Sequence, residues 1–177
     1  MTVMGNNFMT WLAQGFGLIG MLALFWSYQQ NERKRLIAGK LTADVMWVVH
    51  YLCLGALGGA IPNFVGIFRE LVFMHNDKKW AKSVLWPILF ICINWTLAIT
   101  TAKNALSFLP ICASTFVTIS LWAKKPQTTR FIGSGVSVAF IVYDCFVHSW
   151  IGIVNESIAL ISIAVALTRN FRMSSKK

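Results

Sequence analysis

The sequence predicts an all-α integral membrane protein with seven transmembrane helices. Its 177 residues are 56% hydrophobic and have a mean hydropathy of +0.62, which is typical of a single membrane domain. The apolar residues form repeated runs of about 17–22 residues, each long enough to cross a bilayer as a helix. Short clusters of Lys and Arg separate these runs, as expected for a chain that crosses the membrane several times.

Seven apolar stretches define the predicted helices. They lie at about residues 9–30, 41–58, 61–76, 82–100, 104–123, 130–148 and 150–168. The second and third stretches run back to back, with residues 58–62 (GGAIP) as the turn between them. No basic segment precedes the first stretch, so we interpret it as a retained helix rather than a cleaved signal.

The basic residues predict the orientation of the chain. If the basic connections after the first, third and fifth helices and the basic tail are cytoplasmic, fifteen of the sixteen Lys and Arg lie inside and only Lys103 lies outside. The N-terminus is then outside and the C-terminus inside. The formal net charge of +10 follows this pattern instead of coating a soluble surface, which argues against a nucleic-acid partner.

No motif predicts an enzyme, a cofactor or a metal site. Gly15, Gly17 and Gly20 form a literal G-x-G-x-x-G, but no βαβ unit surrounds them, so we interpret them as sites of close helix packing or bending. Four cysteines lie inside apolar runs, at positions 53, 92, 112 and 145. They lack metal-ligand spacing, and we expect buried free thiols.

A shift of 92 residues places the second and third helices over the sixth and seventh and predicts an internal repeat. Four identities fall in one 13-residue window, where about one is expected by chance. The aligned pairs are Tyr51 with Tyr143, Cys53 with Cys145, Ile61 with Ile153, and Asn63 with Asn155. Apolar helices always align to some degree, which is the alternative explanation of the match.

The repeat predicts a 3+1+3 architecture of two parallel three-helix bundles. The first unit covers residues 1–80, a linker helix covers 81–102, and the second unit with its basic cytoplasmic tail covers 103–177. Three spans reverse the side on which the chain emerges, so one extra span is needed before the second unit can begin in the same orientation. A solute site is expected at the interface of such repeats.

This layout, with its external N-terminus, resembles the SWEET, SemiSWEET and PQ-loop superfamily. Within it, the segments FWSYQQNERKRLIAGKLTADVMWVVHYLCLGALGGAIPN and FVGIFRE resemble the YgjV-type bacterial inner-membrane proteins. The resemblance implies a multi-pass protein of the bacterial inner (cytoplasmic) membrane. In SWEETs an asparagine in the third helix of each unit contacts the sugar, which implies Asn63 and Asn155 here. A residue of the second helix packs on the sugar, which implies Trp47 and the turn at residues 139–143.

The chain departs from SWEETs in its prolines. SWEETs carry hinge prolines in helices 1, 2, 5 and 6, and only Pro110 in the fifth predicted helix matches that pattern. Rocking about proline hinges is therefore not implied, although the glycines of the first helix could supply a bend. The YgjV-type proteins have no settled activity, so the resemblance does not carry sugar specificity.

Aromatic and polar side chains share one face of the second predicted helix. Asp44, Trp47 and Tyr51 are spaced at i, i+3 and i+7. Trp47 and Tyr51 could form a flat wall for a sugar or base ring, or they could be ordinary core or interface aromatics. His50, beside this face, could contact a solute or carry a proton, or it could be a satisfied partner between helices.

The candidate site on the second unit combines Tyr143, Asn155 and two carboxyl groups. The Asn63 and Asn155 amides suit a neutral hydroxylated solute, although they could simply join helices. Asp144 and Glu156 are candidates for proton or cation coupling if they are buried, and solvated rim charges if they are not. Arg69 and Glu70 are expected at the cytoplasmic surface, as a solvated or paired boundary.

These features favour a transporter or facilitator of a small polar metabolite, sugar-like or nucleoside-like, that works by alternating access between the two units. The partners are then a small-molecule solute and membrane lipids. A non-transporting receptor or assembly partner is an alternative, and so is a lipid-binding or scrambling protein. The sequence does not identify the substrate, the coupling ion or the oligomeric state.

Overall fold

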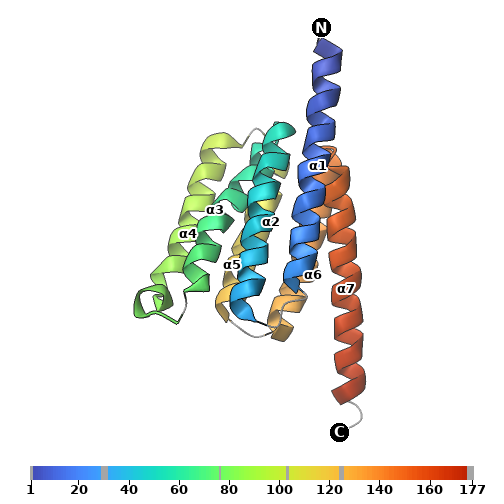
Figure 1. Ribbon diagram of the computed structural model, residues 1–177. Coiled ribbons are helices and arrows are strands. Elements are labelled where there is room, and N and C mark those ends of the chain that lie inside the picture. The colour runs from blue at the N-terminus through green and yellow to red at the C-terminus, as the bar shows by residue number, and fades with distance from the viewer. Residues whose placement is uncertain (1, 29–31, 76, 103, 124–125, 175–177) are drawn as a thin grey trace.

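The computed structural model describes residues 2–28, 32–75, 77–102, 104–123 and 126–174, and Lys103 lies outside these ranges. Within them the chain forms seven α-helices and two short 3-10 helices (Figure 1). The α-helices are α1 Thr2–Tyr28, α2 Arg33–Cys53, α3 Leu57–Met74, α4 Leu85–Thr101, α5 Leu109–Ala123, α6 Pro126–Phe146 and α7 Trp150–Ser174. The short helices are η1 Lys79–Lys82 and η2 Ala105–Phe108. The prediction of an all-helical chain is confirmed.

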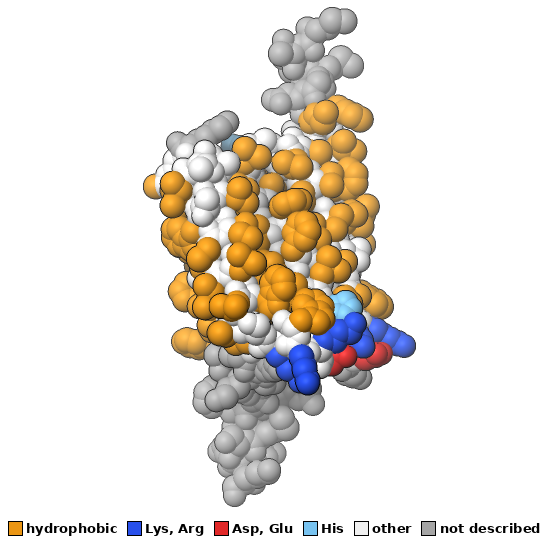
Figure 2. Space-filling model, turned by 90° about the vertical axis from the view of Figure 1, so that its left-hand side faces the viewer, with side chains coloured by type: hydrophobic (Ala, Val, Ile, Leu, Met, Phe, Trp, Pro, Cys, Tyr) orange, Lys and Arg blue, Asp and Glu red, His pale blue; other side chains and the backbone are white. Residues whose placement is uncertain are grey.

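The outer surface of the helices is apolar. Three segments are long and apolar enough to cross a membrane, namely Phe8–Ser27, Leu57–Met74 and Ala105–Trp122. Shorter apolar segments lie in α4, α6 and α7. Figure 2 shows hydrophobic side chains over the side of the molecule and charged side chains gathered at its lower end. This distribution is that of a protein whose sides contact lipid and whose ends contact water.

Six helices close into a ring, and the seventh packs outside it. In order, α1 packs on α2, α2 on α3, α3 on α5, α5 on α6, α6 on α7, and α7 on α1. Helix α4 packs against α3 and α5 and lies at one edge of the molecule (Figure 1). We call the end with the α2–α3 and α6–α7 turns the turn end. The opposite end, with exposed Lys34, Arg35, Lys78 and Lys79, is the basic end.

Helix α2 begins and ends earlier than predicted. The basic stretch expected to be a loop is mostly helical, because its Lys, Arg, Leu and Ala residues are good helix formers. Arg35 also pairs with Glu32 at 3.0 Å in this first turn. The turn to α3 lies at residues 54–56 rather than at 58–62, and Pro62 is buried inside α3. The start of α2 was misplaced because the basic cluster was taken as the boundary of the helix.

The α2–α3 and α6–α7 turns have the same construction. After α2, Gly55 has a φ of +67°, the Ala56 amide donates to the Tyr51 carbonyl at 2.8 Å, and α3 begins. After α6, His148 has a φ of +56°, and the Ser149 amide donates to the Asp144 carbonyl at 2.9 Å. Both are left-handed caps that satisfy carbonyls at the end of a helix.

The boundaries of these two hairpins lie 93 residues apart. Helices α2 and α6 each contain 21 residues, and α3 and α7 begin at Leu57 and Trp150. The sequence identities favoured a shift of 92. A difference of one residue matters, because it rotates a position by about 100° around a helix. In the structural frame the counterpart of Asn63 is Glu156, and the counterpart of Asn155 is Pro62.

The glycines of α1 confirm the prediction of close packing at two of three positions. A Cβ added at Gly17 would overlap Ile151 Cγ2 and lie 2.8 Å from His50 Nδ1. A Cβ at Gly20 would lie 3.2 Å from Trp47 Nε1, whereas a Cβ at Gly15 would meet nothing within 4 Å. Helix α1 therefore approaches α2 and α7 along the Gly17–Gly20 face.

This difference predicts opposite effects of two neighbouring substitutions. Gly17→Ala should destabilise the protein by about 1–3 kcal/mol, because the added methyl group displaces Ile151 and the His50 ring. Gly15→Ala should stabilise it by about 0.5–1 kcal/mol, because the site is open and alanine favours a helix. Thermal unfolding of both variants in the same detergent measures the effects. Equal melting temperatures for the two variants would contradict the packing described for α1.

Candidate functional site

Polar side chains fill the interior of the ring in two layers. The tyrosine layer, near the turn end, consists of His50, Tyr51, Tyr143, Asp144 and Ser149, each at most 2% exposed. The ion-pair layer, closer to the basic end, consists of Lys40, Asp44, Arg69 and Glu70. Helix α2 contributes to both, with Lys40 in its first half, Asp44 near its middle, and His50 and Tyr51 in its last turn. Buried polar groups at membrane depth face a protein interior rather than lipid.

The two tyrosines of the first layer cross between hairpins. Tyr51 of α2 donates to Asp144 Oδ1 of α6 at 2.7 Å, and Tyr143 of α6 accepts a hydrogen bond from the Gly59 amide of α3 at 2.8 Å. Their ring centroids lie 6.0 Å apart in an edge-to-face arrangement. Gly59 makes this contact close, because a Cβ there would lie 2.7 Å from Tyr51 and 2.9 Å from Tyr143. Asp144 is therefore buried, and it is not a rim charge.

His50 is fully buried and bonded through both ring nitrogens. Nδ1 lies 2.7 Å from the Ala13 carbonyl oxygen of α1, and Nε2 lies 2.7 Å from Ser149 Oγ after α6. A carbonyl oxygen only accepts, so Nδ1 carries a proton. His50 therefore joins α1 to the α6–α7 turn, as expected of a partner between helices. It also places the ring one serine away from Asp144.

Trp47 packs toward α1. It is 6% exposed, and its ring meets the His50 ring edge-to-face with centroids 5.1 Å apart. The Tyr51 ring lies beside it at 6.0 Å. The Trp47 and Tyr51 rings are therefore neighbours, and the α1 backbone at Gly20 packs closely against Trp47.

The two asparagines occupy different surroundings. Asn63 is half-buried, and its amide nitrogen donates to the Gly59 carbonyl of its own helix at 2.8 Å. Asn155 is buried and donates to Glu156 Oε1 at 2.9 Å. Glu156 also accepts a hydrogen bond from Ser137 of α6, and its charge interacts with that of Lys40. The second asparagine is thus part of a carboxylate-centred group.

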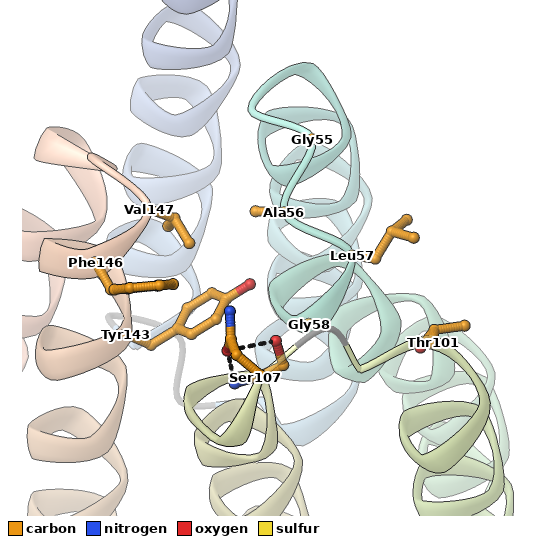
Figure 3. Close-up of a pocket in the computed structure, with 10 residues that line it drawn as sticks. Gly55, Ala56, Leu57, Gly58, Thr101, Ser107, Tyr143, Phe146 and Val147 are labelled. Atoms are coloured by element: carbon orange, nitrogen blue, oxygen red, sulfur yellow. Dashed lines mark hydrogen bonds between the residues drawn. The ribbon is translucent and has the colours of Figure 1, made fainter.

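A cavity of about 120 Å³ opens at the turn end, above the tyrosine layer (Figure 3). Its lining comes from the α2–α3 turn, the α4–α5 connection and the end of α6, and includes Gly58, Thr101, Asn104, Ser107 and Tyr143. Figure 3 shows the Tyr143 ring directed toward Gly58 and Ser107. Of the predicted site residues, Tyr143 is the one that lines this cavity.

The expected surface position of Arg69 and Glu70 is wrong, whereas the alternative that they are paired is confirmed. These residues are 3% and 1% exposed. Arg69 pairs with Glu70 at 3.1 Å, and Lys40 pairs with Glu70 at 3.1 Å and with Asp44 at 3.4 Å. Asp44 Oδ2 lies 3.9 Å from Arg69 Nη2. The expectation failed because α2 begins about two turns before Lys40, which places this level well inside the ring.

Hydrogen bonds from Arg69 of α3 connect the ion-pair layer to α5. Its Nη1 donates to Ser114 Oγ at 3.2 Å and to Thr118 Oγ1 at 3.1 Å, and Ser114 Oγ accepts a further hydrogen bond from Asn94 of α4 at 3.0 Å. Two positive and two negative side chains thus balance in charge within this layer. Buried charges at this depth require such partners.

The expectation of buried cysteines is wrong. All four thiols are free, but Cys53 and Cys112 are only half-buried, and Cys92 and Cys145 are exposed. The error has a simple cause, since an apolar helix face in a membrane can contact lipid as well as a protein core. Within the described residues there is no group of three or more His, Cys, Asp and Glu side chains arranged to hold a metal ion.

Comparison with known proteins identifies the family. Residues 11–174 match the family model Imp-YgjV, described as bacterial inner membrane protein. The chain belongs to this family. It is 19% identical to the inner membrane protein YgjV of Escherichia coli (strain K12) over 166 residues, which cover 94% of this chain and 88% of that protein. No solved structure matches the chain. With its apolar helices, this protein is a multi-pass protein of the bacterial inner membrane.

Sequence reasoning missed Ser149 and the ion-pair layer of this Imp-YgjV protein. Ser149 directly follows His148 and carries no motif, and its contact with His50 spans 99 residues of sequence. Lys40 was assigned to a loop by its basic neighbours. A signal for the layer was present, however. Asp44 shares a helix face with Trp47 and Tyr51, so its carboxylate needed a buried cation nearby.

The ion-pair layer predicts a large difference between two arginine substitutions. Arg69→Met should destabilise the protein by about 3–5 kcal/mol, because it leaves an excess of buried negative charge. Arg35→Met removes an exposed pair, whose side chains are 69% and 58% exposed, and should change stability by at most about 1 kcal/mol. Thermal unfolding in detergent compares the two. Similar losses in both variants would show that the layer does not stabilise the fold as described.

Proposed function

We propose that this inner-membrane protein is a transporter or facilitator of a small polar solute, which passes between two three-helix units by alternating access. The observation that carries the proposal is the pair of buried polar layers inside the ring. A membrane protein that only needed a stable fold could fill this space with apolar side chains, because buried ion pairs add little net stability. Polar groups at membrane depth instead mark solute and ion pathways.

The proposed units are α1–α3 and α5–α7, joined by α4. The common offset of 93 residues in the two hairpins supports this division. The helix order around the ring supports it as well, because contacts within α1–α3 recur within α5–α7, and α3–α5 corresponds to α7–α1. This arrangement is the 3+1+3 layout of the SWEET and PQ-loop superfamily, to which we propose a distant relationship.

Each polar layer joins the proposed units at a different depth. In the tyrosine layer, Tyr51 bonds to Asp144, His50 to Ser149, and Gly59 to Tyr143. In the ion-pair layer, Arg69 bonds to Ser114 and Thr118. Alternating access requires that contacts at one end break while those at the other end hold. The two layers are suited to alternating access, because the hydrogen bonds of one layer can break while those of the other layer remain.

The solute would be held between the layers. Asn63 and Asn155 each make one hydrogen bond to their own helix, which leaves amide capacity for a hydroxylated solute. The cavity above Tyr143 is the proposed external vestibule. Its volume of about 120 Å³ is smaller than the roughly 300–1,000 Å³ of typical ligand sites. The conformation described is therefore a closed one, in which both layers are formed.

A ligand screen tests the proposal and names the solute class. The protein in detergent is heated with sugars, nucleosides, vitamins and amino acids. A solute at about 100 times its dissociation constant should stabilise the folded state by about 2.7 kcal/mol, or about 5–10 °C for a chain of this size. Asn63→Ala and Asn155→Ala should each abolish the shift and the uptake of that solute into proteoliposomes.

The matched control is Thr96→Ala, which changes an exposed polar residue of α4 and should preserve both the shift and the uptake. Normal uptake by both asparagine variants would exclude the proposed solute site. A screen in which nothing shifts the melting temperature would count against transport and favour the receptor, assembly or lipid alternatives.

Cysteine labelling tests the orientation on which the vestibule depends. In a variant without native cysteines, Ser107→Cys lines the cavity at the turn end and should react with a membrane-impermeant maleimide added to spheroplasts. Lys79→Cys, at the basic end, should react only in inverted vesicles. The opposite pattern would reverse the proposed topology.

A further inference from the structure

Asp144 has one carboxylate oxygen that the tyrosine layer leaves without a partner. Tyr51 donates to Oδ1, but Oδ2 meets no well-aligned donor among the described residues, although Asp144 is only 1% exposed and the Ser149 side chain interacts with its carboxyl group. A Cβ added at Gly152 would contact both this Oδ2 and Ser149 Oγ. The two oxygens therefore face the same small space beside α7, which only a glycine leaves open.

The Ser149 hydroxyl lies between this oxygen and His50. Its Oγ is 2.7 Å from His50 Nε2, and His50 Nδ1 already donates to the Ala13 carbonyl. A serine hydroxyl has one proton to donate. If Asp144 is ionised and His50 is neutral, both Oδ2 and Nε2 can only accept. One proton cannot satisfy both, and one buried acceptor is left without a donor.

One additional proton would give both acceptors, Asp144 Oδ2 and His50 Nε2, a hydrogen bond with Ser149. With the proton on Oδ2, Asp144 donates to Ser149 Oγ, which donates to Nε2. With the proton on Nε2, His50 donates to Ser149 Oγ, which donates to Oδ2. The two arrangements differ by the shift of two protons along the chain, and no atom is gained or lost. An unsatisfied polar atom is costly at this depth, which favours proton uptake.

The other groups around Asp144 do not replace this proton. Tyr51 of α2 donates to Oδ1, Tyr143 lies on the same helix, and the Glu156 carboxyl of α7 acts on Asp144 as a like charge. Within the described part of the chain, Asp144 forms no ion pair with Lys or Arg. Lys40 instead pairs with Asp44 and Glu70 in the other layer.

We infer that Asp144, Ser149 and His50 form a binding site for one proton, and that this proton is the coupling ion of the proposed transport. The second part rests on the proposed function, whereas the first does not. The row of hydrogen-bonding groups formed by Asp144, Ser149 and His50 joins α1, α2 and the α6–α7 turn, so loss of the proton removes one of its hydrogen bonds. Proton release thereby loosens the tyrosine layer on the side of the proposed vestibule.

The test follows the proton itself, with the full-length protein in lipid nanodiscs. Infrared difference spectra report the protonated carboxyl group of Asp144, and nitrogen NMR reports the His50 ring as the pH is raised. Both signals should change together at one pH, because they report one shared proton. Asp144→Asn should remove the infrared band, whereas Glu156→Gln should keep it. His75→Gln and His148→Gln identify the His50 signal.

The Ser149→Ala variant tests whether the Ser149 hydroxyl group links Asp144 and His50 into one proton site or only contacts them. Without the hydroxyl group, the carboxyl and imidazole groups should titrate separately, with proton affinities that differ by about tenfold or more, or about one pH unit. A band that survives in Asp144→Asn, or a common titration that persists in Ser149→Ala, would overturn the site. So would a sodium-dependent spectrum at constant pH, which would identify a metal cation as the ligand.

The coupling is measured separately, in proteoliposomes with the solute found by the ligand screen. Uptake should increase under an imposed pH gradient in the native protein and lose this dependence in Ser149→Ala. Uptake without any dependence on the gradient would leave transport intact and exclude coupling. If Asp144 and His50 titrate together but the protein moves no solute, the proton site is retained and transport is excluded.

Discussion

The absence of water from the bilayer interior is the constraint on which this structure depends. Every buried polar group must find its partner within the protein, since none is available from lipid. His50 contacts Ala13 and Ser149 through its two ring nitrogens, and the Nη1 and Nη2 atoms of Arg69 donate to Glu70, Ser114 and Thr118. These pairings join helices that are distant in sequence, so the same contacts that satisfy the polar groups also close the ring.

The exceptions to this rule are the informative atoms. Four buried polar atoms lack a hydrogen-bond partner among the described residues: Asp44 Oδ2, Arg69 Nε, Asn94 Oδ1 and Asp144 Oδ2. Three of them belong to the ion-pair layer and its neighbour Asn94. Unpaired groups in a native core are rare and call for an explanation in terms of function or an additional ligand. Here they occur at the two depths where the proposed units meet, rather than at random positions in the helices.

Much of the fold was predictable because the bilayer limits the choices. Apolar runs of membrane-spanning length could only be helices, which is why the seven helices were found. Their ends were harder to place. A basic cluster such as NERKRLIAGK marks the membrane surface, but a helix can continue through that surface into water, as α2 does. The turn after α2 depended on the left-handed conformation of Gly55, which the more conspicuous Gly-Gly and Pro62 nearby concealed.

The candidate site was less predictable, because side-chain partners are not encoded locally. Tyr51, Tyr143 and Asp144 were each selected from the sequence, but their mutual contacts join α2 to α6 across more than ninety residues. The pairing of Asn63 with Asn155 illustrates a second difficulty. The sequence identities favoured a shift of 92 residues, whereas the boundaries of the two hairpins lie 93 residues apart, and one residue moves a side chain to another helix face.

The two hairpin turns, which share a construction, are not equal in mechanical terms. Gly55 adopts its positive φ at little steric cost, whereas His148 holds a side chain in the same left-handed region, at a cost of about 1–2 kcal/mol. The α6–α7 hairpin thus stores elastic energy that the α2–α3 hairpin lacks. Of the two turns, the strained one is therefore the turn that adjoins Ser149 and its contact with His50.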